Sequence, residues 1–129
     1  IQIGGTMLNV FNTHLGLVPR EQRLQAAALA GAGWLDGCTG PTLLAGDFNA
    51  TSITRPYQTL CRRLQDCQRQ LALKPSVKTF PSAFPAIRID HCFVSPEIRI
   101  RAVRSDYSPL ARVASDHLPL IIDFDVVAA

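Results

Sequence analysis

The stretch LLAGDFNA, residues 43–50, places an acid and an amide directly after an apolar run. The segment 42–45 is typical of the end of a buried strand, and Gly46 lets the backbone turn or be approached closely. Asp47 and Asn49 follow at the mouth of this strand, where removing a carboxylate from water is costly. Asp47 therefore needs a reason to be there, and the rest of the chain supplies one.

The composition indicates one ordinary globular domain that covers residues 1–129. Of these 129 residues 47% are hydrophobic and 18% are charged, with a formal net charge of +3. The charge permits an anionic substrate, but no basic tract indicates strong nucleic-acid binding by itself. No apolar run approaches the roughly 18 residues of a transmembrane helix. Because the first residue is Ile rather than Met, we expect a trimmed start, and the compartment is left open.

The four cysteines do not indicate a zinc site or a dense disulfide scaffold. Cys38, Cys61, Cys67 and Cys92 lack the CxxC spacing that zinc sites use. We expect most of them to be buried thiols.

Hydrophobic periodicity predicts the order β-α-β-α-β-β-β. Alternating or continuous apolar patterns predict strands, and apolar residues at helical spacing predict two helices, the first presenting Leu24, Ala27, Ala28 and Leu35 to a sheet. This order is typical of a layered α+β domain with helices on one face of the sheet. The predicted strands are 6–15, 42–46, 87–95, 98–107 and 117–126, and the predicted helices are 19–35 and 57–71.

Polar residues recur at or near the ends of the other predicted strands. His14 ends the first strand, Asp90 lies in the strand 87–95, and Asp116 and His117 precede the last strand. Taken alone, each is more often a turn former, a cap, an ordinary histidine or an ion-pair partner. Together with Asp47 and Asn49 they indicate a functional site, since strand ends of layered sheets gather in one place.

Such a set favours metal-assisted phosphoester hydrolysis. An aspartate beside a histidine fixes its tautomer and raises its basicity, and a second aspartate can orient or deprotonate water. Amide and imidazole donors can contact phosphoryl oxygens, and carboxylates suit a hard cation such as Mg²⁺. The sequence contains no GxSxG, no phosphate-binding glycine loop and no HExxH.

Four motifs together resemble the endonuclease/exonuclease/phosphatase superfamily. They are FNTHL (11–15), LLAGDFNA (43–50), RIDHCFVSP (88–96) and SDHLPLIIDF (115–124), in this order. The superfamily includes DNase I-like nucleases, abasic-site endonucleases, sphingomyelinases and inositol-polyphosphate phosphatases. The resemblance implies half of a four-layer α/β/β/α sandwich with a mainly antiparallel sheet.

The resemblance also implies a role for each site residue. His14 is similar to the histidine that contacts the scissile phosphate, and Asp47 to the acid that activates the attacking water or protonates the leaving group. Asn49 resembles the amide that binds a phosphate oxygen and helps to hold Asp47. Asp90 resembles the partner that orients and charges His117, which faces the phosphate.

The cofactor that the resemblance implies is Mg²⁺ or Mn²⁺. Asp47 and Asp116 are the carboxylates expected on the metal side of the site. Arg55, Lys78 and Arg88 are candidates to bind the substrate phosphate, although each of them alone is more often an ordinary surface cation.

The chain departs from the family in its length. Family members have about 250 residues, and their first half supplies an asparagine and the glutamate that is the chief metal ligand. Neither has a counterpart here, since Glu21 falls on the first helix and Glu97 between two late strands. The chain therefore resembles the C-terminal half of the domain. Such a half would leave an apolar sheet face in water, which favours a homodimer or another partner.

Three interpretations follow. The first is a metal-dependent phosphoesterase acting on nucleic acid, a phospholipid or a small phosphodiester. The second is a catalytically incomplete half-domain that only dimerises or binds a partner. The third is a binding module without catalysis, which the intact set of polar residues argues against.

Overall fold

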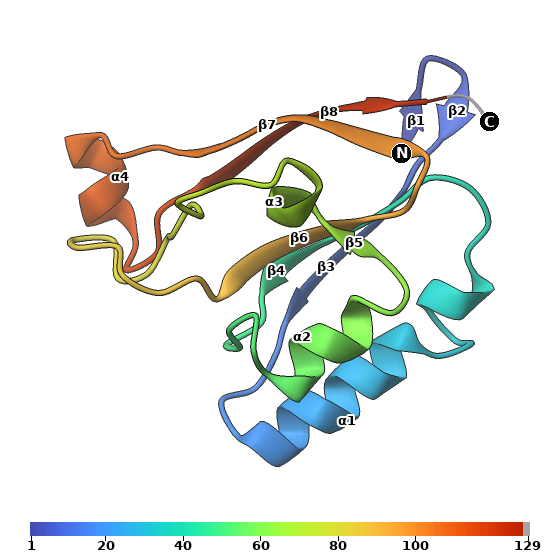
Figure 1. Cartoon of the computed structure of the whole chain (residues 1–129), viewed down its shortest axis with the longest axis horizontal. Helices are drawn as coiled ribbons and strands as arrows, with labels where there is room; N and C mark the ends of the chain where they lie inside the picture. The colour runs from blue at the N-terminus through green and yellow to red at the C-terminus, as the bar shows by residue number, and fades with distance from the viewer. Residues whose placement is uncertain (128–129) are drawn as a thin grey trace.

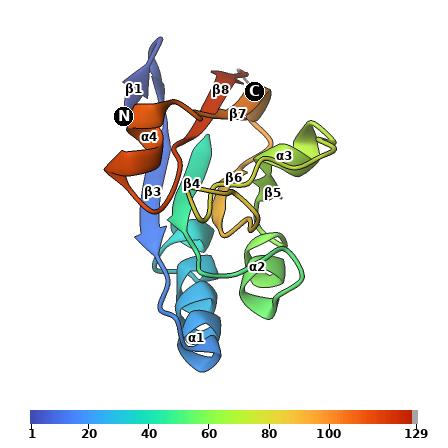
Figure 2. The same cartoon turned by 90° about the vertical axis from the view of Figure 1, so that its left-hand side faces the viewer.

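A four-stranded sheet in the order β3-β4-β6-β5 forms the centre of the molecule. The structure is a computed structural model that describes residues 1–127. In the sheet, β3 and β4 are parallel, and β6 is antiparallel to both of its neighbours. Figure 2 shows β3 at the edge of the sheet beside β4. The four strands are β3 (Asn9–His14), β4 (Thr42–Asp47), β6 (Asp90–Val94) and β5 (Gln65–Asp66).

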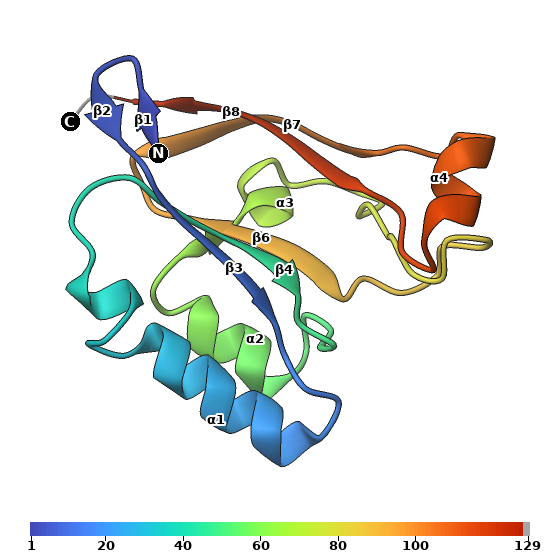
Figure 3. The same ribbon diagram turned by 180° about the vertical axis from the view of Figure 1, so that it is seen from behind.

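Two helices cover one face of this sheet. α1 (Pro19–Ala30) and α2 (Arg55–Leu60) lie together below the sheet in Figures 1 and 3. Both helices have a proline in the first turn, where its missing N–H costs nothing. The core between helices and sheet is built from apolar side chains, among them Leu15, Ala26, Leu44, Tyr57, Leu60 and Phe93.

A two-stranded hairpin covers the other face of the sheet. β7 (Ile98–Ser105) and β8 (Leu120–Val126) pair with each other and lie above the sheet in Figure 1. Leu43, Cys92 and Val94 are buried beneath this hairpin together with Ile98 and Ile100. The prediction of an apolar sheet face left in water is therefore wrong for β4 and β6. A homodimer stays a prediction.

The remaining elements are short. The hairpin β1 (Gln2–Ile3) and β2 (Thr6–Met7) precedes β3, and a 3₁₀ helix, η1 (Leu35–Gly37), follows α1. α3 (Cys67–Gln70) follows β5, and α4 (Pro109–Ala114) joins β7 to β8. The predicted α+β class, with a mainly antiparallel sheet and the main helices on one face, is confirmed. None of the helices within residues 1–127 is long and apolar enough to cross a membrane.

The buried face of α1 differs from the predicted one. Leu24 is 64% exposed, whereas Gln22, Ala26 and Ala30 are buried. The buried residues follow a spacing of four. The prediction placed Leu24, Ala27 and Ala28 on the buried face because they are apolar, but these three are exposed and the polar Gln22 is buried.

The predicted helix 57–71 is interrupted by a strand. α2 ends at Leu60, and β5 pairs with β6 before α3 begins. Asp66 starts the second helix, since its carboxylate caps α3 by accepting from the N–H groups of Gln68 and Arg69. The regular leucine spacing of this segment concealed the capping residue.

Other boundaries are corrected by a few residues. The predicted strands 87–95 and 117–126 shorten to β6 and β8, and α4 was not predicted although Ser108 caps it and Pro109 starts it. The expectation for the cysteines holds for Cys67 and Cys92, which are buried, whereas Cys38 and Cys61 are partly exposed.

Candidate active site

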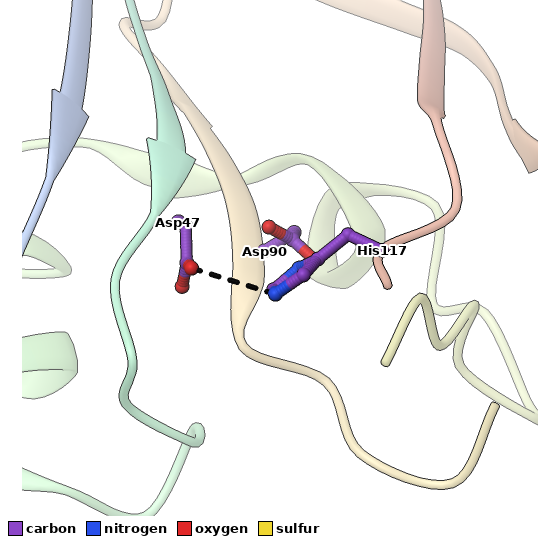
Figure 4. Close-up of side chains that lie close together, drawn as sticks. All are labelled: Asp47, Asp90 and His117. Carbon is purple, nitrogen blue, oxygen red and sulfur yellow. Dashed lines mark hydrogen bonds and ion pairs between the residues drawn. The ribbon is translucent and has the colours of Figure 1, made fainter. Parts of the chain in front are cut away.

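The register of three neighbouring strands places His14, Asp47 and Asp90 in one row. His14 at the end of β3 pairs with Asp47 at the end of β4, and Asp47 pairs with Asp90 at the start of β6. Figure 4 shows Asp47, Asp90 and the loop residue His117 pointing toward one another. Three of the four motifs therefore meet on the sheet, and the fourth meets them from the loop before β8.

Gly46, the residue before Asp47, lets β4 lie unusually close to β3. Its φ is +149°, and a Cβ at this position would lie 1.8 Å from the carbonyl oxygen of Thr13. No other residue type fits this contact without moving a strand. The glycine in the LLAGDFNA stretch therefore fixes the row that carries His14 and Asp47.

Asp47 is surrounded by donors and remains 18% exposed. Its Oδ1 accepts the N–H of Asn49 at 2.8 Å. Its Oδ2 lies 3.3 Å from Nε2 of His14 and 3.6 Å from Nε2 of His117. The carboxylate is thus oriented by the backbone on one side and faces two imidazoles on the other.

Asn49 ties β3 to the loop after β4. Its Nδ2 donates to the carbonyl of Leu15 at 2.9 Å and lies 3.2 Å from Nε2 of His14. The His14 side chain is 72% exposed, so an incoming ligand can reach it. The side chains of both Asn49 and Asp47 are therefore fixed before any ligand binds.

His117 is held by Asp90 on one side and by an aromatic ring on its face. Its Nδ1–H donates to Oδ2 of Asp90 at 2.8 Å, and its ring centroid lies 4.8 Å from that of Phe80. The hydroxyl of Thr79 donates to the same oxygen of Asp90. The Asp90 bond fixes the tautomer and directs Nε2 of His117 toward Asp47.

The pKa of His117 is raised above its ordinary value. Burial acts to lower it, but the hydrogen bond to Asp90 and the negative charges of Asp90, Asp47 and Asp116 outweigh that effect. These carboxylates therefore favour the imidazolium form of His117. An imidazolium facing this site suits an anionic ligand.

A cavity of about 230 Å³ adjoins the two carboxylates. Its lining includes Asp47 and Asp90 and apolar residues of β4, β6 and β8. The cavity lies between the sheet and the hairpin, so the polar row borders a space with apolar walls.

Asp47, Asp90 and His117 offer ligand atoms that lie within 4.8 Å of one another. Two carboxylates suit Mg²⁺ or Mn²⁺, because such ions bind one or two protein carboxylates and retain several waters. Asp90 already accepts from His117 and Thr79, so Asp47 is the freer ligand of the three.

The structure does not bring every predicted site residue into this cluster. Asp116 is exposed, and its Oδ1 lies against the hydroxyl of Ser115, so it lies outside the group of Asp47, Asp90 and His117. Arg88 donates to the buried Asp66, and its side chain is 12% exposed. Its partner is therefore inside the fold, and the role of Arg88 in substrate binding stays a prediction. Arg55 at the start of α2 and Lys78 beside Thr79 are both exposed.

Sequence reasoning missed Thr79 and Phe80, which support Asp90 and His117. Both lie in the proline-rich segment 78–86, where no periodicity distinguishes one residue from another. Their contacts depend on how this loop folds over β6, and no local pattern reports that.

Comparisons with known proteins identify the family of the chain. The sequence profile of the Endonuclease/Exonuclease/phosphatase family matches residues 2–117. The chain belongs to this family. A comparison with curated proteins gave no match.

Several solved structures share the fold. A conserved protein of unknown function from Enterococcus faecalis is 22% identical, with a TM-score of 0.72 over 91% of this chain and 49% of its own. The mannosyl-6-phosphatase Bt3783 of Bacteroides thetaiotaomicron is 22% identical, with a TM-score of 0.68 over 90% of this chain and 50% of its own.

A third structure, TDP2 of D. rerio complexed with a single-strand DNA product, is 17% identical. Its TM-score is 0.74 over 96% of this chain and 58% of its own. The chain therefore spans about half the length of these solved structures. At such identities the likeness shows the fold, and what each of them acts on belongs to that protein.

Proposed function

We propose that the chain carries the catalytic centre of a divalent-metal-dependent phosphoester hydrolase. The observation that carries this proposal is the row His14, Asp47 and Asp90 completed by His117. It places a partly exposed carboxylate between two imidazoles, one of which is hydrogen-bonded to a second carboxylate. A general base beside hydrogen-bond donors is what attack of water on a phosphate ester requires.

The proposed roles follow from the contacts. Asp47 orients the attacking water and accepts its proton as the new P–O bond forms and the bond to the leaving group breaks. His117, charged by Asp90, donates through Nε2 to phosphoryl oxygens as negative charge increases there. His14 supplies a second imidazole on the open side, and Asn49 holds Asp47 and supplies an amide donor.

Mg²⁺ or Mn²⁺ is the proposed cofactor, and the donor set fits such an ion. Asp47 would hold it, and Asp90 is the nearest further carboxylate. When bound, the ion supplies positive charge that polarises the phosphoryl group. The chain's own residues then bind the ester, position the water and move its proton.

The proposed substrate is a phosphate ester, of nucleic acid, of a phospholipid or of a small molecule. Two of the matched structures are a mannosyl-6-phosphatase and TDP2 of D. rerio complexed with a single-strand DNA product. The sugar phosphate that the first name implies and the DNA in the second structure are both phosphate esters, which supports the reaction class but does not choose between substrates.

The alternative is a catalytically incomplete half-domain that dimerises or binds a partner. The observation that favours it is the coverage of about half of each matched structure. In that case the residues of this chain contribute to a site that a further polypeptide segment completes.

The test is hydrolysis of bis-p-nitrophenyl phosphate, with and without Mg²⁺ or Mn²⁺. We expect metal-stimulated turnover that Asp47→Asn reduces at least about 100-fold, because the amide cannot accept the proton of water. Asp123→Asn is the matched control, since Asp123 is a half-exposed carboxylate paired with Arg104 on the hairpin. Turnover that survives Asp47→Asn would refute the assigned site. No turnover at all would favour the incomplete half-domain.

A further inference from the structure

The loop that carries Asn49 is held by buried side chains that the proposed reaction does not use. Asn49 has a φ of +47°, in the left-handed region that non-glycine residues visit uncommonly. A conformation of this kind persists where the surroundings impose it. The contacts of the residues on either side of Asn49 show what imposes it here.

His91 holds the carbonyl that follows Asn49. Its Nε2 lies 2.7 Å from the oxygen of Ala50, and the side chain is fully buried. Because a carbonyl oxygen only accepts, Nε2 must carry the proton and donate it. His91 follows Asp90 in β6, so one strand presents Asp90 to the site and His91 to the loop that carries Asn49.

The other nitrogen of His91 faces a buried carboxylate. Nδ1 lies 3.6 Å from Oδ2 of Asp66, whose side chain is 0% exposed. The same oxygen accepts from the hydroxyl of Tyr57 at 3.0 Å and from the guanidinium of Arg88. This group of four, which we call the inner cluster, is Tyr57, Asp66, Arg88 and His91. The rings of Tyr57 and His91 pack against each other in the core, with centroids 4.9 Å apart.

Gln22 holds the carbonyl of Asn49 itself from the opposite side. Its Nε2 donates to the oxygen of Asn49 at 2.9 Å and to that of Gly16 at 2.8 Å. Gln22 is a polar residue in the buried stripe of α1. Two successive carbonyls, those of Asn49 and Ala50, therefore accept from buried donors on α1 and β6.

Phe48 anchors the loop on the same side as His91. Its ring is 1% exposed and meets that of His91 edge to face, with centroids 5.6 Å apart. The loop can therefore neither rotate at Asn49 nor lift at Phe48 without breaking buried contacts.

We propose that Gln22 and His91 are positioning residues for Asn49. By holding the two carbonyls, they keep Asn49 in its left-handed conformation. This conformation directs Nδ2 to Leu15 and His14, and the N–H of Asn49 to Asp47. The expected effect of Gln22 and His91 on catalysis rests on the proposed function. Their expected effect on the conformation of Asn49 does not.

The kinetic test compares two substitutions of His91 in the full chain. His91→Phe keeps an aromatic ring but removes the donor, and His91→Gln places an amide N–H near the position of Nε2. We expect His91→Phe to lower kcat at least about tenfold with little change in KM, and His91→Gln to recover most of it. In an Asn49→Ala background His91→Phe should have no further effect on kcat, because both changes act through one residue.

The geometric test needs no activity. The side-chain amide signals of Asn49 in a ¹H–¹⁵N spectrum are assigned by their absence in Asn49→Asp. We expect Gln22→Met and His91→Phe each to shift these signals and to speed their exchange with solvent. Gln68→Met is the matched control, since Gln68 is a buried glutamine that clamps Val77 elsewhere in the fold.

Each outcome decides the inference. Asn49 signals that stay unchanged in Gln22→Met and His91→Phe, or that change equally in Gln68→Met, would overturn it. If His91→Phe does not fold, Gln22→Met and His91→Gln still give the answer. An absence of hydrolysis in the unmodified chain would favour the incomplete half-domain and leave this inference standing, because the spectra report on Asn49 without hydrolysis.

Discussion

Asp47 and Asp66 show that the fold holds two aspartates for different purposes. Asp47 keeps part of its surface in water and faces two imidazoles across a space that a ligand can enter. Asp66 is fully buried and caps α3 while it accepts from Tyr57 and Arg88. Its partners all lie inside the fold, so we expect it to act on stability rather than on chemistry.

Asp66 gives a prediction for the pH dependence of stability. Burial acts to raise its pKa, but the neighbouring His91 imidazole, the Arg88 guanidinium and the cap of α3 lower it from 3.8 to about 2. Because the pKa of Asp66 is lower in the folded chain than in the unfolded chain, its ionised carboxylate stabilises the fold fully at pH values above the pKa in the unfolded chain. This stabilisation is lost as the pH falls through the pKa in the folded chain. Between about pH 4 and pH 2 the loss should be about 2 kcal/mol.

Urea unfolding at several pH values measures this loss. Asp66→Asn should lower the free energy of unfolding at neutral pH, because it leaves Arg88 buried without its ionic partner. It should also flatten the decrease between about pH 4 and pH 2. Asp36→Asn, which removes the more exposed pair with Arg63, is the control for the loss of one carboxylate. If Asp66→Asn and the unmodified chain give parallel curves, the assignment to Asp66 is wrong.

At the scale of elements, the contact between β3 and β4 decides the geometry of the site. Gly46→Ala should destabilise the chain by about 3 kcal/mol or more, because the added methyl group would meet the Thr13 backbone at 1.8 Å. Gly33→Ala is the control, since a Cβ there meets nothing within 4 Å, and its effect should stay within about 0.5 kcal/mol. Thermal and urea unfolding measure the free energy of unfolding of both variants. Equal losses would show that the close contact between Gly46 and Thr13 does not constrain β3 and β4.

The main strands could be predicted from the sequence because each carries its own apolar pattern. The errors arose where a tertiary contact overrides the local pattern. The segment 57–71 has helical spacing, but the buried Asp66 ends one element and caps the next. On α1, the buried stripe is Gln22, Ala26 and Ala30 rather than the predicted apolar face, and its polar member is the one that holds Asn49.

At the scale of the whole molecule, helices, sheet and hairpin form three layers (Figure 1). The core on the helix side holds the loop after β4 through Phe48 and His91, and the core on the hairpin side lies beneath β7 and β8. The site lies at the end of the sheet where these layers meet the loop before β8. It therefore depends on both cores.

The residues of the site could be predicted because strand-end motifs carry them, and the register of β3, β4 and β6 brings three of them together. The residues that support the site could not be predicted from the sequence. Thr79, Phe80 and His91 act through contacts between segments far apart in the sequence. Single-sequence patterns report local structure, and these contacts are products of the complete fold.

Hydrolysis of a phosphodiester in H₂¹⁸O tests the central claim most directly, with the product examined by ³¹P NMR. The account predicts one ¹⁸O atom in the phosphoryl product and none in the released alcohol. The labelling should occur with the unmodified chain and with Asp123→Asn, and it should fall to the blank with Asp47→Asn. Label in the alcohol, or equal labelling with Asp47→Asn, would contradict the claim that Asp47 directs water to phosphorus.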